Sequence, residues 1–179
     1  MSEVTYNGLT FEPFISREEI AEQVQRVAAE LKRDYDDKKR LFICVLNGAF
    51  IFAADVFRAC DIHDAEIEFI RFKSYEGTSS TGNMKQIMGL NTDVAGRHVV
   101  ILEDIVDTGF TADQLRNLLI EKGAADVKMA SLLFKPDSLK AGVAPEYIGF
   151  TIPPKFILGY GLDLDELARN LPDIYVLKK

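Results

Sequence analysis

The chain has 179 residues, 47% of them hydrophobic and 27% charged, and its formal net charge at pH 7 is −7. This composition is typical of a folded globular domain and excludes a mainly disordered protein, and the acidic balance argues against nucleic acid as the main partner. No apolar segment approaches the roughly 20 residues needed to span a bilayer, and the N-terminus lacks the basic start and apolar core of a signal peptide.

The first predicted element is a helix that packs through one face. Ser16 followed by Glu19 matches a capping box, so we expect the helix to begin at Arg17. Four apolar residues recur at helical spacing and define its buried face: Ile20, Val24, Val27 and Leu31. No catalytic signal occurs in the first 40 residues, whose expected role is packing.

A buried strand and a second helix follow. Residues 41–46, LFICVL, form an apolar run typical of a strand inside a sheet, and Asn47-Gly48 ends it. The next helix is predicted over residues 49–59. Its core-facing residues are expected to be Phe50, Ala53, Ala54 and Phe57.

Cysteine and histidine usage limits the chemistry of the chain. Cys44 and Cys60 are expected to be reduced core thiols rather than a disulfide. His63 and His98 have no partner at ligand spacing, which argues against a His/Cys metal site. Together with the missing signal peptide, these features predict a cytoplasmic protein.

A longer strand is predicted over residues 65–75, with alternate side chains on its two faces. Residues 76–83, EGTSSTGN, are small, polar and flexible, and the strand-like run MKQIMGL resumes at once. We interpret this segment as a mobile hairpin tip that closes over a ligand, with Ser74 and Tyr75 at its root.

The stretch HVVILEDIVDTGFT, residues 98–111, is the most informative part of the chain. Residues 99–102 read as a buried strand, the carboxylates Glu103 and Asp104 follow at once, and Asp107 comes three residues later. Ligands of open α/β sheets bind at the carboxyl ends of strands, where this segment is expected to lie.

The residues after Asp107 indicate an anion site at the start of a helix. Gly109 permits a close backbone approach, and the N–H groups of the following helix favour an anion, with Thr108 and Thr111 hydroxyls as further donors. Acids beside an anion cradle suit a ligand that carries both a phosphate and neutral hydroxyls. A sugar phosphate fits that description.

The last third of the chain is less regular. Residues 127–134 are predicted to form an apolar strand, which places Lys135 at the same sheet edge as the three acids. A further strand is predicted over residues 146–153, a short helix over residues 164–171, and a last strand over residues 174–177.

Strands that alternate with helices through short loops predict a single α/β domain, residues 1–179, with a mostly parallel sheet. Neither the GxGxxG pattern nor the Walker pattern occurs. The expected phosphate site is therefore neither a Rossmann dinucleotide site nor a P-loop.

Residues 103–111, EDIVDTGFT, resemble the phosphoribosyl pyrophosphate motif of type I phosphoribosyltransferases, and more narrowly that of the hypoxanthine or hypoxanthine–guanine enzymes. The resemblance extends from about Leu46 to Arg169. Three residues narrow it to 6-oxopurines: Lys135, Phe156 and Asp163. It implies a twisted, mostly parallel sheet flanked by helices, with a flexible hairpin loop and a small irregular hood built from terminal segments, including residues 144–179.

The resemblance also implies an activity. The chain is expected to be a purine salvage enzyme that transfers the 5-phosphoribosyl group from phosphoribosyl pyrophosphate to N9 of hypoxanthine and of guanine. The products are IMP or GMP and pyrophosphate. Mg²⁺ is the implied cofactor, and a homodimer or homotetramer is the implied assembly.

The same resemblance assigns the phosphoribosyl side of the site. The 5′-phosphate would be wrapped by Asp107, Thr108, Gly109, Phe110 and Thr111. Glu103 and Asp104 would lie near the ribose hydroxyls, directly or through Mg²⁺. Asp107 would also be the catalytic base, facing N7 of the purine.

For the purine, Lys135 would donate to the 6-oxo oxygen, Phe156 would stack on the base, and the Ile157 carbonyl would accept from an amino group at C2. Asp163, beside the purine site, would help hold a metal ion bound to pyrophosphate. Arg169 would contact pyrophosphate itself.

The main-chain amides around Asn47 and Gly48 would complete the pyrophosphate site, and the peptide before Asn47 can be cis in this family. The chain departs from the family pattern at two positions. Asn47 and Phe110 stand where many relatives carry Lys or Arg, so backbone donors are left to neutralise the anion. Two alternatives stay open: a xanthine-preferring phosphoribosyltransferase, and an RNA-binding pyrimidine regulator on the same scaffold.

Overall fold

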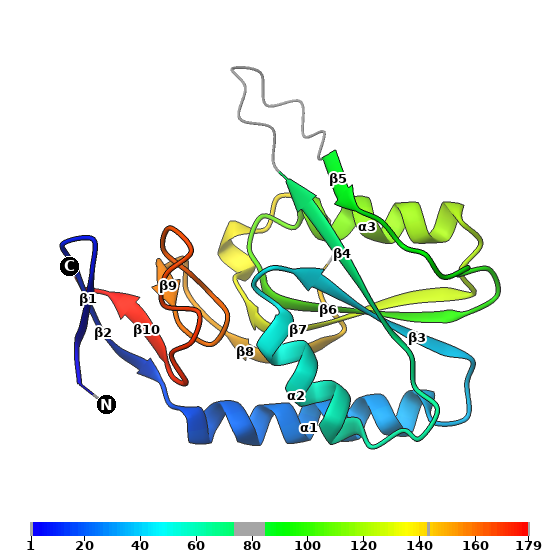
Figure 1. The fold of residues 1–179 in the computed structure, drawn as a ribbon, viewed down its shortest axis with the longest axis horizontal. Coiled ribbons are helices and arrows are strands. Elements are labelled where there is room, and N and C mark those ends of the chain that lie inside the picture. The colour runs from blue at the N-terminus through cyan, green and yellow to red at the C-terminus, as the bar shows by residue number, and fades with distance from the viewer. Residues whose placement is uncertain (1, 74–84, 143, 179) are drawn as a thin grey trace.

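The computed structural model describes residues 2–73, 85–142 and 144–178, and its main body is a six-stranded twisted sheet (Figure 1). The strand order is β5-β4-β3-β6-β7-β8; the pairs from β4 to β8 are parallel, and β5 is antiparallel to β4. The strands are β3 (Arg40–Leu46), β4 (Ile67–Lys73), β5 (Lys85–Met88), β6 (His98–Val106), β7 (Asp126–Phe134) and β8 (Tyr147–Thr151). The expected α/β fold with a mostly parallel sheet is confirmed.

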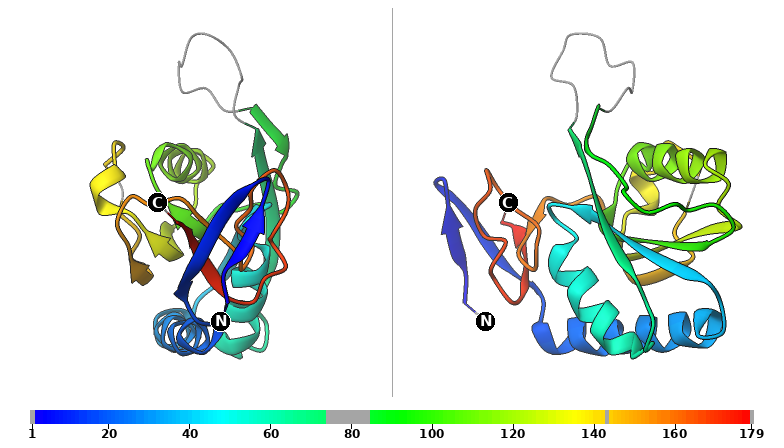
Figure 2. Two further views of the ribbon diagram at one scale, coloured as in Figure 1. Left: turned by 90° about the vertical axis from the view of Figure 1, so that its left-hand side faces the viewer. Right: turned by 45° about the vertical axis from the view of Figure 1, so that its right-hand side comes forward.

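Helices cover both faces of this sheet. α1 (Arg17–Tyr35) and α2 (Phe50–Cys60) lie on one face, α3 (Phe110–Glu121) lies on the other, and the 3₁₀ turn η1 (Pro136–Ser138) follows β7 (Figures 1 and 2). The Ser16 hydroxyl accepts from the Glu19 N–H, and the Glu19 carboxylate accepts from the Ser16 N–H. The expected capping box and the start of α1 at Arg17 are therefore confirmed.

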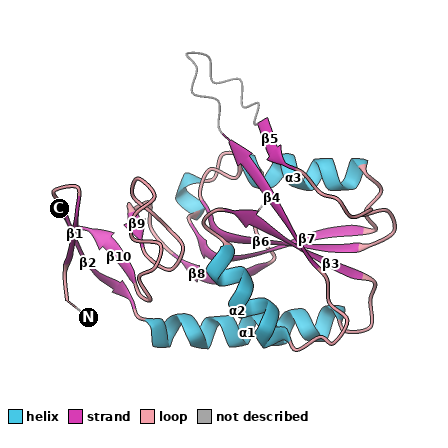
Figure 3. Cartoon of the chain, viewed as in Figure 1, coloured by secondary structure: helices cyan, strands magenta, loops and turns pink. Residues whose placement is uncertain are grey.

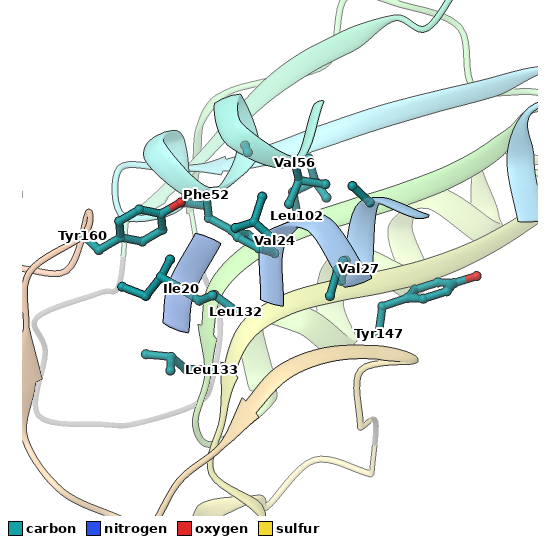
Figure 4. Packing of buried hydrophobic residues seen from close by; sticks show 14 of the residues in the cluster. Ile20, Val24, Val27, Phe52, Val56, Leu102, Leu132, Leu133, Tyr147 and Tyr160 are labelled. Carbon is teal, nitrogen blue, oxygen red and sulfur yellow. The ribbon is translucent and has the colours of Figure 1, made fainter. Parts of the chain in front are cut away.

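One apolar layer fills the space on each face of the sheet. Figure 4 shows the layer in which α1 packs against α2 and the strands β6 and β7; its members include Ile20, Val24, Val27, Phe52, Val56, Leu102 and Leu132. The layer under α3 includes Leu115 and Leu119. Because the central strands are covered on both faces, they contain continuous apolar runs, such as residues 41–46 of β3 and 99–102 of β6. Cys44 and Cys60 are buried and unpaired, as expected.

The two ends of the chain form a second sheet beside the first, here called the hood (Figure 3). Its antiparallel strand order is β1-β2-β10-β9. The strands are β1 (Val4–Tyr6), β2 (Leu9–Ile15), β9 (Ile157–Leu158) and β10 (Ile174–Leu177). β8 lies within the range expected to build the hood, but it is the edge strand of the large sheet.

The buried face of α2 differs from the expected one. The buried residues are Phe52, Ala53, Val56 and Cys60. Phe57 packs partly on the core, whereas Phe50 and Ala54 are exposed, so the expectation was wrong for these two. Nine of the eleven residues of this helix are apolar and only Asp55 and Arg58 are polar, so its pattern identifies the buried face only weakly.

The short helix predicted over residues 164–171 is not formed. Asp165, Glu166 and Ala168 have positive φ angles of 51°, 66° and 71°, which a right-handed helix does not contain. Leu164 and Leu167 form an isolated antiparallel bridge instead. This segment is part of a tight loop between β9 and β10, which we call the β9–β10 loop (residues 159–173).

β4 and β5 form the expected antiparallel hairpin. The expected mobile tip over residues 76–83, with Ser74 and Tyr75 at its root, lies outside the described residues. Among the helices of the described segments, none is long and apolar enough to cross a membrane.

Candidate active site

Two adjacent carboxylates, Glu103 and Asp104, lie near the carboxyl end of β6. The strand continues to Val106, so both acids are inside it rather than after it. Burial, together with the charge of Asp104, raises the pKa of Glu103 well above its ordinary value. Burial also raises the pKa of Asp104 to about 6, against the opposing effect of the Ile105 N–H, which donates to Asp104 Oδ1 at 2.9 Å. A cation or a hydroxyl-bearing ligand would stabilise both acids in their ionised forms.

The loop after β6 turns into α3 at Gly109. This residue precedes the helix with a φ of 82°, and no side chain at that position caps the helix. A Cβ atom on Gly109 would lie 2.7 Å from Leu139 Cδ1 and 3.1 Å from the Ala141 carbonyl oxygen. The turn therefore requires glycine both for its conformation and for its close contact with the loop after β7.

A pocket of about 270 Å³ lies between the two acids and this turn. The predicted site residues that line it are Gly48, Glu103, Asp104, Asp107, Thr108, Gly109 and Thr111. Phe110 is exposed and is not among the lining residues. The carboxyl ends of β3 and β6 and the first turn of α3 thus bring most of the predicted phosphoribosyl set together at one sheet edge.

Gly48, in the turn after β3, lines one side of this pocket. The Leu46–Asn47 peptide is cis, as the family resemblance allowed. A Cβ atom on Gly48 would overlap the Asp104 carboxylate, and a Cβ atom on Gly161 would overlap the Gly48 carbonyl. Three chain segments therefore meet here without space for a side chain at either glycine.

Lys135 follows β7 and pairs with Asp107, which follows β6. The Lys135 N–H donates to the Val106 carbonyl at 3.0 Å, which holds the two strand ends together. Its amine donates to Asp107 Oδ2 at 2.9 Å, and its side chain is only 10% exposed. A lysine this buried needs a partner for its charge, so the pair is a specific feature of the site.

Arg169 lies in the β9–β10 loop and is held by two acids and a carbonyl. One guanidinium nitrogen is 2.9 Å from Asp163 Oδ1 and 2.9 Å from Glu166 Oε2, and another donates to the Gly161 carbonyl at 2.7 Å. The positive charge of Arg169 lowers the pKa of Asp104, whereas the charge of Asp163 raises it. The loop therefore faces the acids of β6.

The hood presents one aromatic ring. Phe156, immediately before β9, is 47% exposed, and its ring packs on the buried Phe11 of β2 with a centroid distance of 6.1 Å. Ile157 is buried in β9. An exposed ring supported by a buried one is suited to contact a planar ligand.

Within the described residues, no three His, Cys, Asp or Glu side chains are grouped so as to hold a metal ion by themselves. The expected ligands Glu103, Asp104 and Asp163 thus do not form a complete cage. Mg²⁺ usually keeps several waters and binds through one or two carboxylates together with substrate phosphates. The buried carboxylates of β6 fit that mode of binding.

Two residues at this site were not singled out from the sequence. Glu166 and Gly161 both contact Arg169, and Gly161 also touches Gly48. The only signal for Gly161 is the pair of glycines that flank Tyr160, because closely spaced glycines often mark a close backbone approach. Glu166 had no signal of its own.

Comparisons with known proteins agree with this geometry. Residues 16–165 match the family model described as the phosphoribosyl transferase domain. The chain is 42% identical over 165 residues to the hypoxanthine-guanine phosphoribosyltransferase of Bacillus subtilis (strain 168), with 92% of this chain and 91% of that protein covered. It is 40% identical over 165 residues to the hypoxanthine-guanine-xanthine phosphoribosyltransferase of Tritrichomonas foetus, with 92% and 90% covered. A solved hypoxanthine phosphoribosyltransferase from Staphylococcus aureus superposes with a TM-score of 0.89 at 36% identity, covering 93% of this chain and 91% of that one.

Proposed function

The chain belongs to the phosphoribosyl transferase family, and on that premise we propose that it is a hypoxanthine–guanine phosphoribosyltransferase of purine salvage. It transfers the 5-phosphoribosyl group from phosphoribosyl pyrophosphate to N9 of hypoxanthine or guanine, which yields IMP or GMP and pyrophosphate. The observation that carries this proposal is the Lys135–Asp107 pair, because it sets a cation beside a carboxylate that lines the proposed phosphoribosyl pocket.

The two partners match two neighbouring atoms of a 6-oxopurine. Lys135 carries only donors and suits the 6-oxo oxygen, and Asp107 as a carboxylate suits the N7 proton. The Phe156 ring stacks on the base, and the Ile157 carbonyl accepts from the amino group of guanine. Adenine presents a donor at C6, which leaves Lys135 unpaired and makes adenine a poor substrate.

The phosphoribosyl end of the donor lies in the pocket of β6. Main-chain N–H groups at residues 107–111 and the Thr108 and Thr111 hydroxyls hold the 5′-phosphate at the N-terminus of α3. Glu103 and Asp104 accept from the ribose hydroxyls and favour positive charge on the sugar as pyrophosphate leaves. Asp107 removes the N7 proton while N9 attacks, which typically contributes about 10²–10⁴ in rate.

Pyrophosphate lies between the turn at Asn47–Gly48 and Arg169. The backbone N–H groups of that turn and the guanidinium of Arg169 offset the charge of the leaving group. When bound, Mg²⁺ supplies further positive charge at the pyrophosphate oxygens, and Glu103, Asp104 and Asp163 are the residues that would hold it. These carboxylates would thereby fix the position of the pyrophosphate relative to the ribose hydroxyls.

A spectrophotometric screen of purine bases with phosphoribosyl pyrophosphate and Mg²⁺ tests the proposal. We expect turnover with hypoxanthine and guanine and none with adenine. A preference for xanthine would favour the alternative to which the Tritrichomonas foetus relative points. The absence of turnover with all four bases would refute the proposed function.

We also infer that the protein is a homo-oligomer. The inferred contact is an apolar surface on α2 and β4, defined by Phe50, Phe57 and Phe69, where Phe50 and Phe69 are 44% and 42% exposed. A second copy can cover this patch with the same patch through a twofold axis. Light scattering of Phe50→Ser/Phe69→Ser should show monomers, whereas Ile120→Ser, which removes an exposed residue of α3, should leave the assembly intact.

The proposed location is the cytoplasm. Cys44 and Cys60 are free and buried, and burial raises the pKa of both thiols to about 12. Unreactive free thiols suit a reducing compartment. The substrates of purine salvage are expected to be present there.

A further inference from the structure

Tyr160 has an unusual backbone conformation at the start of the β9–β10 loop. Its φ is 50°, and it lies between Gly159 and Gly161, whose φ angles are 98° and 99°. A positive φ is uncommon for a bulky residue and costs free energy, so the surrounding contacts must hold it in place. Both glycines are required by close contacts, because a Cβ atom on Gly159 would overlap the Asp173 carbonyl and one on Gly161 the Gly48 carbonyl.

Two contacts hold the Tyr160 side chain. Its ring belongs to the buried layer that contains Ile20 and Phe52 (Figure 4). Its hydroxyl donates to Asp55 Oδ2 on α2 at 2.6 Å. Hydrogen bonds to a carboxylate are among the stronger ones in proteins, and this one joins residues 105 positions apart.

Between Tyr160 and residues 170–172, the β9–β10 loop borders a cavity instead of packing directly on the helices. A cavity of about 690 Å³ lies between α1, α2 and this loop, and Tyr160, Asp55, Arg17 and Leu171 are among its lining residues. Two polar contacts join the loop to the helices at this cavity. Tyr160 forms a hydrogen bond with Asp55, and Arg17 forms an ion pair with Asp173. Apolar packing alone does not set the position of the loop at this point.

Tyr160 and Asp55 each lie close in the chain to a part of the proposed pyrophosphate site. On one side, Asp55 lies in α2, which begins two residues after Gly48. On the other side, the Gly161 N–H donates to the Arg169 carbonyl at 2.9 Å, and the Gly161 carbonyl accepts from the Arg169 guanidinium at 2.7 Å. The Tyr160–Asp55 bond, the close contact of Gly161 with Gly48, and the first turns of α2 therefore form a closed ring of contacts.

We propose that Tyr160 is a positioning residue for pyrophosphate: through its bond to Asp55 it sets the spacing between the Gly48 turn and Arg169. The proposal rests on the proposed function, in which pyrophosphate binds between the Gly48 turn and Arg169. Loss of the bond allows the β9–β10 loop to shift toward the cavity. The distance between the Gly48 turn and Arg169 then no longer matches pyrophosphate. The purine contacts at Lys135 and Phe156 are outside this ring and stay in place.

Tyr160→Phe tests the proposal because it keeps the ring and removes only the hydroxyl. We expect KM for phosphoribosyl pyrophosphate and Kd for magnesium pyrophosphate, measured by calorimetry, to rise roughly three- to tenfold. KM for hypoxanthine and kcat should change less than about twofold. Asp55→Ala removes the same bond from the other side, together with the exposed Asp55–Arg58 pair, and the double variant should be no worse than Asp55→Ala alone.

Tyr147→Phe is the matched control. Tyr147 is buried to the same degree, 8% exposed against 7%, belongs to the same apolar layer, and donates to Asp34 at 2.8 Å. It lies at the amino end of the large sheet, far from Tyr160 in Figure 4. We expect Tyr147→Phe to lower the melting temperature by a similar amount and to leave every kinetic constant and the pyrophosphate Kd unchanged.

The outcomes separate this inference from the proposed function. Wild-type protein that neither binds magnesium pyrophosphate nor turns over any purine refutes the function, and the inference with it. Active wild-type protein whose pyrophosphate affinity is unchanged by Tyr160→Phe and by Asp55→Ala overturns the inference alone. Equal effects of Tyr160→Phe and Tyr147→Phe on all constants also overturn it, because a general loss of stability would then explain both.

Discussion

The amine of Lys135 lies 2.9 Å from the carboxylate of Asp107, so the two side chains proposed to read the purine are bonded to each other in the free protein. Lys135 is nearly buried and cannot turn to bulk water for a partner. A 6-oxopurine offers an acceptor to the lysine and a proton to the aspartate at adjacent positions. When a 6-oxopurine binds, the Lys135 ammonium and the Asp107 carboxylate both keep a hydrogen-bond partner. An apolar base or a 6-amino base cannot supply an acceptor to Lys135.

Asp107→Asn should lower kcat for hypoxanthine by about 10²–10⁴, because the amide cannot accept the N7 proton. Steady-state kinetics at saturating phosphoribosyl pyrophosphate measures this effect. Asp137→Asn is the control, since Asp137 is an exposed acid in η1, two residues after Lys135. Unchanged turnover in Asp107→Asn would rule out a role as general base.

Lys135→Met should raise KM for hypoxanthine roughly 10- to 100-fold, because the 6-oxo oxygen would lose its donor on binding. KM for phosphoribosyl pyrophosphate should stay near the wild-type value. Lys128→Met provides the comparison, since Lys128 lies in β7 but near its amino end. Wild-type protein that used adenine as well as hypoxanthine would contradict the role given to Lys135.

Gly48→Ala should reduce kcat/KM for phosphoribosyl pyrophosphate by about 100-fold, the cost typical of a displacement near 1 Å in a site. The added methyl group would overlap the Asp104 carboxylate, so either the acid or the turn must move. Gly142→Ala is the control, because a Cβ atom there meets no heavy atom within 4 Å. Equal activity of the two variants would mean that the turn at Gly48 does not contribute to the site.

Asp173→Asn should lower the free energy of unfolding at pH 7 by about 2 kcal/mol, because it weakens hydrogen bonds to a charged group. The Asp173 side chain is 3% exposed and accepts from the Arg17 N–H at 2.8 Å and from its guanidinium at 2.9 Å. Hydrogen bonds from Arg17 hold the pKa of Asp173 below its ordinary value.

A lowered pKa in the folded state fixes the sign of the pH dependence. The contribution of Asp173 is fully present above the ordinary aspartate pKa of about 3.9 and is lost as the pH falls through the lower folded value. Urea unfolding from pH 7 down to about pH 3.5 should show a constant difference between the wild type and Asp173→Asn that begins to narrow only at the acid end. Asp61→Asn, which removes an exposed pair with Lys32, should differ little from wild type at any pH.

The sequence was sufficient to predict those structural elements that are determined by residues close together in the chain. The cap of α1 depends on Ser16 and Glu19, three residues apart, and the helix begins where they predict. The apolar run of β6 and the acids that follow it placed the pocket at the correct sheet edge. The common edge of Glu103, Asp107 and Lys135 follows from the general topology of parallel sheets, whereas the strand order was not predicted.

The errors arose where the determining contact is distant in sequence. Nine of the eleven residues of α2 are apolar, so the position of the sheet largely decides that Phe52 is buried and Phe50 exposed. The segment 164–171 has helical composition but left-handed residues, because Arg169 and Gly161 bond across it. The Tyr160–Asp55 bond and the contact of Gly48 with Gly161 each join residues more than 100 positions apart, and no local pattern announces them.

The hood joins strands from opposite ends of the polypeptide, with β2 paired to β10 and the Phe156 ring supported by Phe11. During synthesis the large sheet can be completed once β8 has emerged, but the β1–β2 hairpin has no partner until β10 has also emerged. The proposed stacking surface for the purine, Phe156 on Phe11, is therefore completed only after the large sheet. We expect substitutions that disrupt the pairing of β2 with β10 to impair nucleobase affinity while sparing the fold of the large sheet.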